Sequence, residues 1–239
     1  MNKLGIIGGT SWASTALYYE QINKGVAVRL GGLHSARLAI ESLDFGPLAA
    51  MHQAGDWDGA IRVAVEAAVR LKASGAEGLL IASNTMHKAR AAVEAATGLE
   101  VIDIAAATAE RIAADGRSHV ALLGTRFTMT EPFAREAYEQ RGIVFHELNG
   151  QWRSEVDRII YEELAAGRVV RESQRKLKTL ITELAKQKVQ AIILGCTELV
   201  LAVDARANVL PVYDTTAIHA RAAVEWMLDD VAAARRKAA

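Results

Sequence analysis

Two apolar segments of this chain end in matching polar motifs, and this repeat limits the folds that the chain can adopt. The segment 75–82 leads into Ser83-Asn-Thr, and the segment 189–195 leads into Cys196-Thr-Glu, 113 positions later. Each apolar run follows an amphipathic stretch with helical periodicity and stops abruptly at small polar residues. In both places the pattern predicts a helix, a buried parallel strand and a polar loop.

A second pair of motifs extends the repeat. Lys3-Leu-Gly-Ile-Ile-Gly-Gly-Thr near the start of the chain resembles His119-Val-Ala-Leu-Leu-Gly-Thr in its middle. Gly8 and Gly124 are 116 positions apart, which is close to the spacing of the first pair. We therefore expect two related α/β lobes, and two copies are too few for a solenoid.

The expected elements alternate along the chain, which predicts parallel sheets with helices on both faces. No linker rich in Ser, Gly or Pro separates the lobes, so we expect a short hinge. The first lobe is expected to comprise residues 1–104 and 213–239, and the second residues 105–212. The expected strands are 3–8, 36–43, 77–82, 99–104, 119–123, 143–146, 189–194 and 209–212; the expected helices are 13–29, 56–74, 87–96, 105–115, 131–141, 153–165, 169–187, 197–202 and 215–231.

The four polar motifs all fall at the carboxyl ends of expected strands. In open parallel sheets, ligands bind at these ends. The loops that begin at Gly8, Ser83, Gly124 and Cys196 therefore predict an active site in a polar cleft between the two lobes.

Bulk properties favour a compact soluble enzyme. The chain has 239 residues and a net charge of +0, so nothing in its overall balance favours nucleic acid or an anionic membrane as a partner. Its apolar runs have the length of strands, and its start lacks the long apolar region of a signal peptide. A single cysteine forms no internal disulfide, which suits a reducing compartment, and we expect a cytoplasmic protein.

Metal and dinucleotide sites are not expected. The six histidines and one cysteine form no His-x-x-x-His or Cys-x-x-Cys spacing. The glycines after the first strand lack the Gly-x-Gly-x-x-Gly pattern, so a tight strand-to-helix turn explains them better than a cofactor site.

Cys196 and Ser83 are the candidate catalytic residues. The pKa of a thiol is lowered at a helix N-terminus, so Cys196 could act as a thiolate base or nucleophile if a helix starts at Thr197. The alternative is a buried core cysteine, which is common. For Ser83 the alternative is a serine that caps a helix.

Threonine hydroxyls and loop amides at the strand ends could bind a small carboxylate and stabilise negative charge that develops on it. The hydroxyls belong to Thr10, Thr85, Thr125 and Thr197. Each threonine taken alone is better explained as a helix cap.

Six motifs taken together resemble the cofactor-independent aspartate/glutamate racemase family, including its broad-specificity amino-acid racemase branch. The resemblance spans nearly the whole chain, and the ordered set is more specific than any one motif. Glu198 resembles the aspartate racemase side, because dedicated glutamate racemases typically have histidine there. The motifs are Gly5-Ile-Ile-Gly-Gly-Thr-Ser-Trp12, Arg29-Leu-Gly-Gly-Leu-His34, Asn84-Thr-Met-His-Lys88, Leu123-Gly-Thr-Arg-Phe-Thr-Met129, Gly195-Cys-Thr-Glu198 and Asp214-Thr-Thr-Ala-Ile-His219.

The resemblance implies a mechanism that uses no cofactor. In such enzymes two cysteines flank Cα; one removes its proton as a thiolate and the other delivers a proton to the opposite face. Oriented amides and hydroxyls around the α-carboxylate stabilise the planar carbanion. Position by position, Cys196 matches one member of this pair.

The departure from the family pattern is Ser83, where most of the family has cysteine. A hydroxyl is a much weaker acid than a thiol and is not a credible base on its own. Either the serine is natural and the enzyme favours one enantiomer, or it is an engineered Cys-to-Ser change. In both cases Ser83 belongs to the active site, and we expect Cys196 to be the base for the L form.

Substrate choice is the least constrained feature. Thr10 replaces a methionine that is common in the resembled branch, and His52 lies where relatives have a basic or amide residue that is thought to face the substrate side chain. The alternative for His52 is a surface histidine on a loop. Asn84, Thr85, Thr125, Thr197 and Glu198 complete the expected substrate-binding set, and Arg29, His34 and Lys88 are further candidates for a distal carboxylate.

Three functions remain open. The first is a racemase acting on aspartate or glutamate, or on a wider set of amino acids. The second is a one-cysteine decarboxylase or isomerase of the same superfamily, and the third is an inactive protein that binds small dicarboxylates. Family members often pair, so we also expect a homodimer with a small-molecule amino acid as its ligand.

Overall fold

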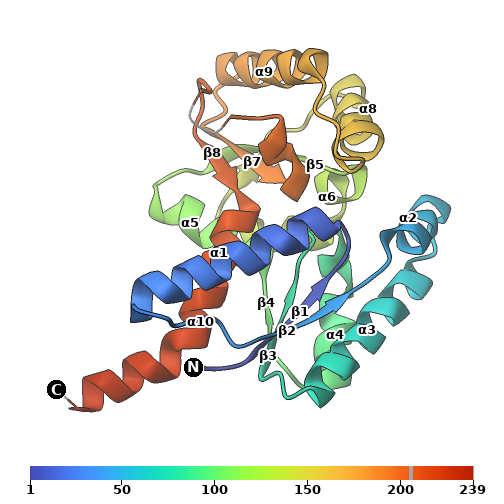
Figure 1. Cartoon of the computed structure of the whole chain (residues 1–239). Coiled ribbons are helices and arrows are strands. Elements are labelled where there is room, and N and C mark those ends of the chain that lie inside the picture. Colours follow the sequence, from blue (N-terminus) through green and yellow to red (C-terminus); the bar gives the residue numbers. More distant parts are fainter. Residues whose placement is uncertain (205–206, 239) are drawn as a thin grey trace. The chain divides into compact units, whose positions relative to one another are not determined.

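The computed structural model describes residues 1–204 and 207–238. The chain forms two compact units, unit 1 with residues 1–103 and 219–239 and unit 2 with residues 104–218 (Figure 1). Compared with the expected ranges, Ile104 and the segment 213–218 fall in unit 2. The physical reason for the second difference is β8 (Val212–Asp214), which pairs with a strand of unit 2.

Unit 1 contains a four-stranded sheet with the order β2-β1-β3-β4. Its strands are β1 (Leu4–Gly8), β2 (Leu38–Ser42), β3 (Gly78–Ile81) and β4 (Val101–Ile102). All neighbours are parallel, and Ile7 pairs with Ile81, so β1 and β3 end side by side. The loops that follow these two strands are therefore neighbours.

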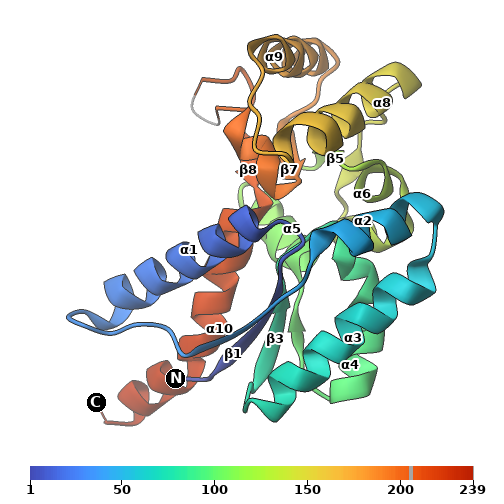
Figure 2. The same ribbon diagram turned by 45° about the vertical axis from the view of Figure 1, so that its right-hand side comes forward.

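Helices cover both faces of this sheet (Figure 2). Leu4 and Ile6 pack with α1 (Trp12–Leu30) and α10 (Thr215–Ala238). Ile7 faces the other way and packs with α3 (Trp57–Ala73) and α4 (Arg90–Thr97). Because successive strand residues point to opposite faces, a continuous apolar run supplies both layers of the core.

Unit 2 repeats this plan with the strand order β6-β5-β7-β8. Its strands are β5 (His119–Gly124), β6 (Val144–Phe145), β7 (Ala191–Gly195) and β8, and all neighbours are parallel. Gly124 pairs with Gly195, so β5 and β7 also end side by side. The same strand order in both units confirms the repeat that the motifs predict.

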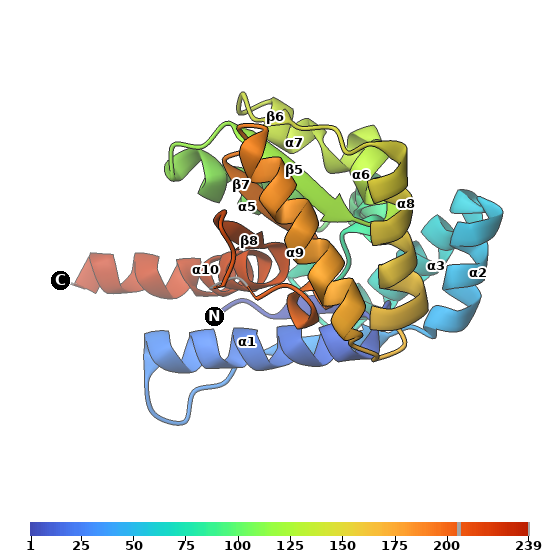
Figure 3. The same cartoon turned by 90° about the horizontal axis from the view of Figure 1, so that it is seen from above.

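Two helical layers also cover the sheet of unit 2. One face packs against α8 (Gly150–Arg158) and α9 (Arg171–Lys186), which lie next to each other in Figure 3. The other face packs against α5 (Ile104–Ala114) and α7 (Glu136–Glu139). The expected α/β class, with two parallel sheets flanked by helices, is confirmed.

Several helices differ from the sequence expectation. The helix α2 (Phe45–Ala54) was not expected; Asp44 caps it by accepting a hydrogen bond from the Gly46 N–H at 3.1 Å. The segment after β5 contains α6 (Arg126–Thr130) and the short 3₁₀ helix η2 (Pro132–Ala134) before α7. The expected helix 87–96 begins as the 3₁₀ helix η1 (Thr85–Ala89) and continues as α4, and the expected helix 197–202 is the 3₁₀ helix η4 (Thr197–Leu201).

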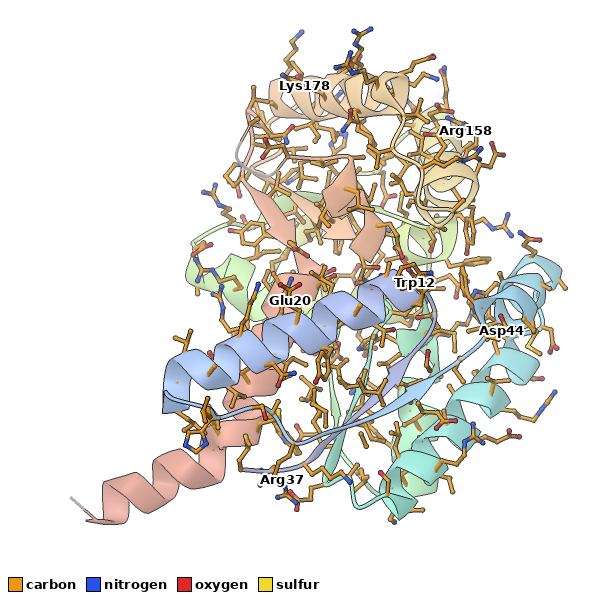
Figure 4. The ribbon with its side chains drawn as sticks, in the orientation of Figure 1. Trp12, Glu20, Arg37, Asp44, Arg158 and Lys178 are labelled. Atoms are coloured by element: carbon orange, nitrogen blue, oxygen red, sulfur yellow. The ribbon has the colours of Figure 1, made fainter. Side chains whose placement is uncertain are left out.

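A π-helical turn, η3 (Ile159–Leu164), continues α8 within the range expected to be regular helix. Just before it, Arg158, labelled in Figure 4, donates two hydrogen bonds of 3.0 Å to the Glu155 carboxylate. Lys176 donates another to Glu155 at 2.9 Å, and these cations lower the pKa of Glu155 to about 2. The network ties α8 to α9.

Replacing Glu155 with glutamine is expected to lower the free energy of unfolding by about 1–2 kcal/mol at pH 7. Because the folded-state pKa lies below the usual 4.5, the stabilisation is complete above pH 4.5 and is lost as the pH falls toward 2. Urea unfolding of both proteins at several pH values measures the difference. Glu172→Gln is the matched control, since this exposed carboxylate only approaches Lys176 at 3.5 Å and should change stability little. Equal effects of the two substitutions would contradict the prediction.

None of the helices in the described part of the chain is long and apolar enough to cross a membrane.

Candidate active site

The loop after β1 packs against the start of α1. A Cβ on Gly8 would lie 2.5 Å from Thr15 Cγ2, and the Gly9 N–H donates to Thr15 Oγ1 at 2.8 Å. Gly9 has a φ of +82°, a conformation that favours glycine. Thr10 follows in this loop, and its hydroxyl lies 3.5 Å from the Ala82 carbonyl oxygen, next to the end of β3.

Ser83 is half-buried at the end of β3. Its Oγ accepts a hydrogen bond from the Met86 N–H at 3.3 Å, so the hydroxyl caps the first turn of η1 and keeps its own proton. Its carbonyl oxygen accepts from His87 Nδ1 at 2.6 Å. Residues of η1 thus bind both the side chain and the carbonyl group of Ser83. Asn84 and Thr85 lie between Ser83 and these residues.

Two buried histidines, His87 and His219, pack against each other next to this loop. His219 Nε2 donates to the Ile102 carbonyl at 2.7 Å, which leaves Nδ1 to accept from the Tyr18 hydroxyl at 2.9 Å. The ring of His219 meets that of His87 edge-on, with centroids 5.4 Å apart. Burial, together with the neighbouring His87, lowers the pKa of His219 to about 3, and burial lowers that of His87.

His52 lies in α2 and is buried, contrary to the alternative of a surface loop histidine. Its ring stacks on Trp57 at a centroid distance of 5.0 Å, and Nε2 lies 3.1 Å from Met86 Sδ. Burial and the nearby Lys88 lower its pKa. The structure therefore brings His52 against η1, the helix that begins at Thr85.

In unit 2, Cys196 directly follows β7, and its thiol and the Thr197 hydroxyl bind the same carboxylate. Cys196 Sγ donates to Glu198 Oε2 at 3.0 Å, and Thr197 Oγ1 donates to the same oxygen at 2.7 Å. All three side chains are almost fully buried, and the cysteine is a free thiol. The arrangement joins a thiol, a hydroxyl and a carboxylate at one strand end.

The expected lowering of the Cys196 pKa is wrong. Burial raises the pKa well above the ordinary value, and the charge of Glu198 and its hydrogen bond raise it further. The backbone N–H groups of Glu198 and Leu199 act in the opposite direction, as a helix N-terminus should, but they are outweighed. The helix expected after Cys196 is a five-residue 3₁₀ helix. With its pKa raised, Cys196 holds a proton at neutral pH.

The loop after β5 lies beside the cysteine loop. A Cβ on Gly124 would lie 3.0 Å from the Gly195 carbonyl oxygen. Thr125 caps α6 by accepting from the Thr128 N–H at 3.3 Å, and the two threonine hydroxyls are 3.1 Å apart. The capping role considered for Thr125 is thus present.

Sequence reasoning missed a fourth polar group near the cysteine. Tyr161 lies in η3 and is half-buried. Burial, followed by the charges of Asp157, Cys196 and Glu198, raises its pKa to about 12. No spacing in the sequence connects residue 161 with residue 196, so no pattern pointed to it.

A model of the Asp/Glu/Hydantoin racemase family matches residues 7–223. This chain belongs to that family. A candidate Asp/Glu racemase from Yersinia pestis is 44% identical, with a TM-score of 0.88 over 95% of this chain and 100% of that chain. An aspartate racemase homologue from Pyrococcus horikoshii OT3 is 32% identical, with a TM-score of 0.79 over 95% of this chain and 99% of that one. An aspartate racemase from Picrophilus torridus, 15% identical, shares the fold, with a TM-score of 0.72 over 97% and 95% of the chains.

In this member of the Asp/Glu/Hydantoin racemase family, the structure gathers the expected site residues into two groups. The group in unit 1 contains Thr10, His52, Ser83, Asn84 and Thr85, around the ends of β1 and β3. The group in unit 2 contains Thr125, Cys196, Thr197 and Glu198, around the ends of β5 and β7. Ser83 and Cys196 occupy equivalent positions in their sheets.

Other basic and acidic candidates have structural roles in this racemase-family chain. In the last of the six motifs, Asp214 caps α10 by accepting from the N–H groups of Thr216 and Ala217, at 2.9 and 3.2 Å, and the His219 ring is packed against Tyr18 and His87. Arg29 faces Glu225 at 3.4 Å on the surface, and Lys88 Nζ lies 4.0 Å from the Trp57 ring centroid. Within the described ranges, no group of three or more His, Cys, Asp or Glu side chains could hold a metal ion.

The buried histidine pair should make this racemase-family protein sensitive to mild acid. The folded-state pKa of His219 is about 3, whereas an unfolded histidine titrates near 6.5. Below pH 6.5 the unfolded chain binds a proton that the folded chain does not, so stability falls as the pH drops from 6.5 toward 3. The expected slope is up to about 1.4 kcal/mol per pH unit for each such histidine.

Urea unfolding between pH 7.5 and 5 measures this slope. His219→Gln should be less stable at pH 7.5, because it loses the hydrogen bonds to Tyr18 and Ile102, yet it should show a shallower pH dependence. His34→Gln, at an exposed position, serves as the control and should retain the parent slope. An unchanged slope in His219→Gln would contradict the prediction.

Proposed function

We propose that this protein is a cofactor-independent amino-acid racemase acting on aspartate or glutamate, by removing and returning the proton at Cα. The observation that carries the proposal is the Cys196 thiol hydrogen-bonded to Glu198 at the end of β7 in a chain of this family. A racemase needs one proton-transferring group for each face of Cα. Cys196 supplies one, and Ser83 holds the equivalent strand-end position for the other.

Cys196 begins the cycle protonated, because burial and Glu198 both favour the thiol. In this form it is the acid that delivers a proton to a carbanion. To act as a base it first transfers its proton away, and Glu198 Oε2, 3.0 Å from the sulfur, is the acceptor in its reach. The ammonium group of a bound amino acid would stabilise the resulting thiolate by its charge.

Ser83 makes the second side weaker than a thiol would. Its hydroxyl has a proton to donate, since it accepts rather than donates toward Met86. A serine hydroxyl is a much weaker acid than a thiol and delivers its proton to the carbanion slowly. The L form, which presents its α-hydrogen to Cys196 in this proposal, therefore exchanges that hydrogen faster than it inverts. The two enantiomers have equal free energy in water, and the preference therefore resides in rate and binding constants.

The carbanion requires a neighbourhood rich in hydrogen-bond donors because no cofactor withdraws its charge. Loop amides and the hydroxyls of the threonines at the strand ends supply these donors. The proposed substrate-binding residues are Thr10, His52, Asn84, Thr85, Thr125, Thr197 and Glu198.

The test is proton NMR of L-aspartate and L-glutamate with the purified protein in D2O, followed by chiral chromatography. We expect loss of the α-proton signal together with slower appearance of the D enantiomer. If neither substrate exchanges its α-proton, the racemase proposal is wrong, and substituted malonates become the next substrates to examine. Binding without exchange would favour a dicarboxylate-binding protein.

A further inference from the structure

The π-helical turn η3 packs on the segment that holds the catalytic thiol. Ile159, Ile160 and Leu164 of this turn share one core cluster with Cys196 and with Leu199 of η4. A π turn inserts an additional residue into a helix, shifts the direction of the side chains that follow, and is frequent at functional sites. Tyr161 lies in the middle of this turn.

Ion pairs hold the turn in place. Glu163, almost fully buried, accepts a hydrogen bond from Arg158 Nη1 at 2.9 Å, and Arg158 is itself paired with Glu155. Lys176 connects the same network to α9. Ion pairs of Arg158, before Tyr161, and of Glu163, after it, therefore hold the segment that contains this ring.

The phenol hydroxyl is an available hydrogen-bond donor. Within the described part of the chain no hydrogen bond involves the Tyr161 hydroxyl, although the carboxylate charges of Asp157 and Glu198 act on it. These negative charges and burial keep the phenol protonated at any physiological pH. A protonated phenol can donate to an acceptor that the protein itself does not provide.

Of the charges that act on the phenol, that of Arg126 favours an anionic acceptor, and the two nearby carboxylates already have hydrogen-bond donors of their own. Glu198 Oε2 is already shared by the Cys196 thiol and the Thr197 hydroxyl, and Asp157 Oδ1 accepts from the Arg126 N–H at 2.7 Å. The Arg126 guanidinium lies over the Phe127 ring, 4.7 Å from its centroid, and forms no ion pair with the described residues. Its positive charge lowers the pKa of Tyr161, whereas the carboxylates raise it.

We propose that Tyr161 is a substrate-binding residue, whose hydroxyl donates a hydrogen bond to a carboxylate group of the amino acid held beside Cys196. The proposal rests on the function proposed above, and it assigns a role to the π turn that family membership alone does not. Arg126 supplies the nearby positive charge for the same carboxylate.

Tyr161→Phe tests the proposal because it removes only the hydroxyl. Cys196 is the sole cysteine, so its alkylation by iodoacetamide at pH 9, followed by mass spectrometry, reports access to the thiol. L-Aspartate should protect the parent protein, and Tyr161→Phe should raise the half-protecting concentration about 10- to 100-fold. The KM for α-proton exchange should rise in parallel, with a smaller change in kcat.

Tyr213→Phe is the matched control. The hydroxyl of Tyr213 donates to Asp115 at 2.8 Å within the same unit, so its loss should leave protection unchanged. Comparing L-aspartate with L-asparagine identifies the carboxylate. An equal loss of protection for both ligands assigns the hydrogen bond to the α-carboxylate, and a loss for L-aspartate alone assigns it to the side-chain carboxylate.

The outcomes separate this inference from the proposed function. If the parent protein exchanges the α-proton and Tyr161→Phe is protected as well as the parent, the inference is wrong and the racemase proposal stands. If the parent is protected without exchange and Tyr161→Phe loses protection, the inference stands and the racemase proposal fails. Absence of protection by L-aspartate or malonate in the parent overturns the inference. The inference is also overturned if alkylation of Tyr161→Phe has a higher pH midpoint than that of the parent while protection by L-aspartate is unchanged. Tyr161 would then stabilise the Cys196 thiolate instead of binding the ligand.

Discussion

Replacing Cys196 with alanine is expected to reduce α-proton exchange of L-aspartate or L-glutamate about 10²- to 10⁴-fold, because a positioned proton-transfer group contributes a factor of this size. The substitution removes the thiol that donates to Glu198 Oε2 and leaves the Thr197 bond to the same oxygen in place. The local fold should therefore survive, and ligand binding should persist. Proton NMR in D2O measures the exchange rate, and exchange at the parent rate in Cys196→Ala would remove the thiol from the mechanism.

The companion variant is Ser83→Cys, which supplies a thiol at the strand end equivalent to that of Cys196. Inversion is expected to become faster, because a thiol near pKa 8.5 transfers protons more readily than a serine hydroxyl. Chiral chromatography measures the ratio of inversion to exchange, which should move toward one. In the double variant Ser83→Cys with Cys196→Ala the only thiol is at position 83. This control shows whether the new thiol merely takes over the role of Cys196. A ratio that does not change in Ser83→Cys would place Ser83 outside the proton-transfer step.

Gly9→Ala is expected to lower the free energy of unfolding by about 3 kcal/mol. Alanine would have to adopt a left-handed backbone conformation, and its Cβ would clash with neighbouring atoms. A Cβ at this position would lie 2.1 Å from the carbonyl oxygen and 2.2 Å from the nitrogen of Leu43. These are backbone atoms, and the Leu43 N–H also donates to the Gly8 carbonyl at 3.0 Å, so no side chain can move aside to relieve the clash. Urea unfolding measures the loss.

Gly98→Ala separates the two contributions. Gly98 also has a positive φ, +66°, but nothing lies within 4 Å of a Cβ built there. This variant should lose about 1 kcal/mol, the cost of the left-handed conformation alone. If Gly9→Ala costs no more than Gly98→Ala, the loop after β1 moves away from Leu43 more easily than the structure indicates, and Thr10 is not held rigidly next to β3.

Strand-end motifs predicted the fold well because each buried strand is an apolar run that ends in glycine or a small polar residue. The runs ending at Gly8, Ile81, Gly124 and Gly195 all form parallel strands. Helix type was less predictable. The segments after Ser83 and Cys196 have residues that suit an α-helix, yet both begin as 3₁₀ helices, since tertiary contacts decide the geometry of so short a segment.

The chemistry of the site was harder to foresee than its location. The sequence places Cys196 two residues before Glu198, but only the structure shows that the carboxylate turns back to accept from the thiol and so opposes ionisation. His52 was expected near the substrate side chain or on the surface, and its burial depends on α2, a helix with weak sequence signals. The position of Tyr161 depends on a π turn, which no local sequence pattern predicts.

The hydrogen bond between Cys196 and Glu198 also bears on chemical durability. Peroxide and other oxidants attack the thiolate form of cysteine, and the protein holds this sulfur protonated and almost fully buried. With no other cysteine in the chain, no neighbouring thiol of the same chain can rescue a sulfenic acid by forming a disulfide. The Glu198 carboxylate favours the protonated thiol, and it is therefore expected to slow oxidation of this sulfur.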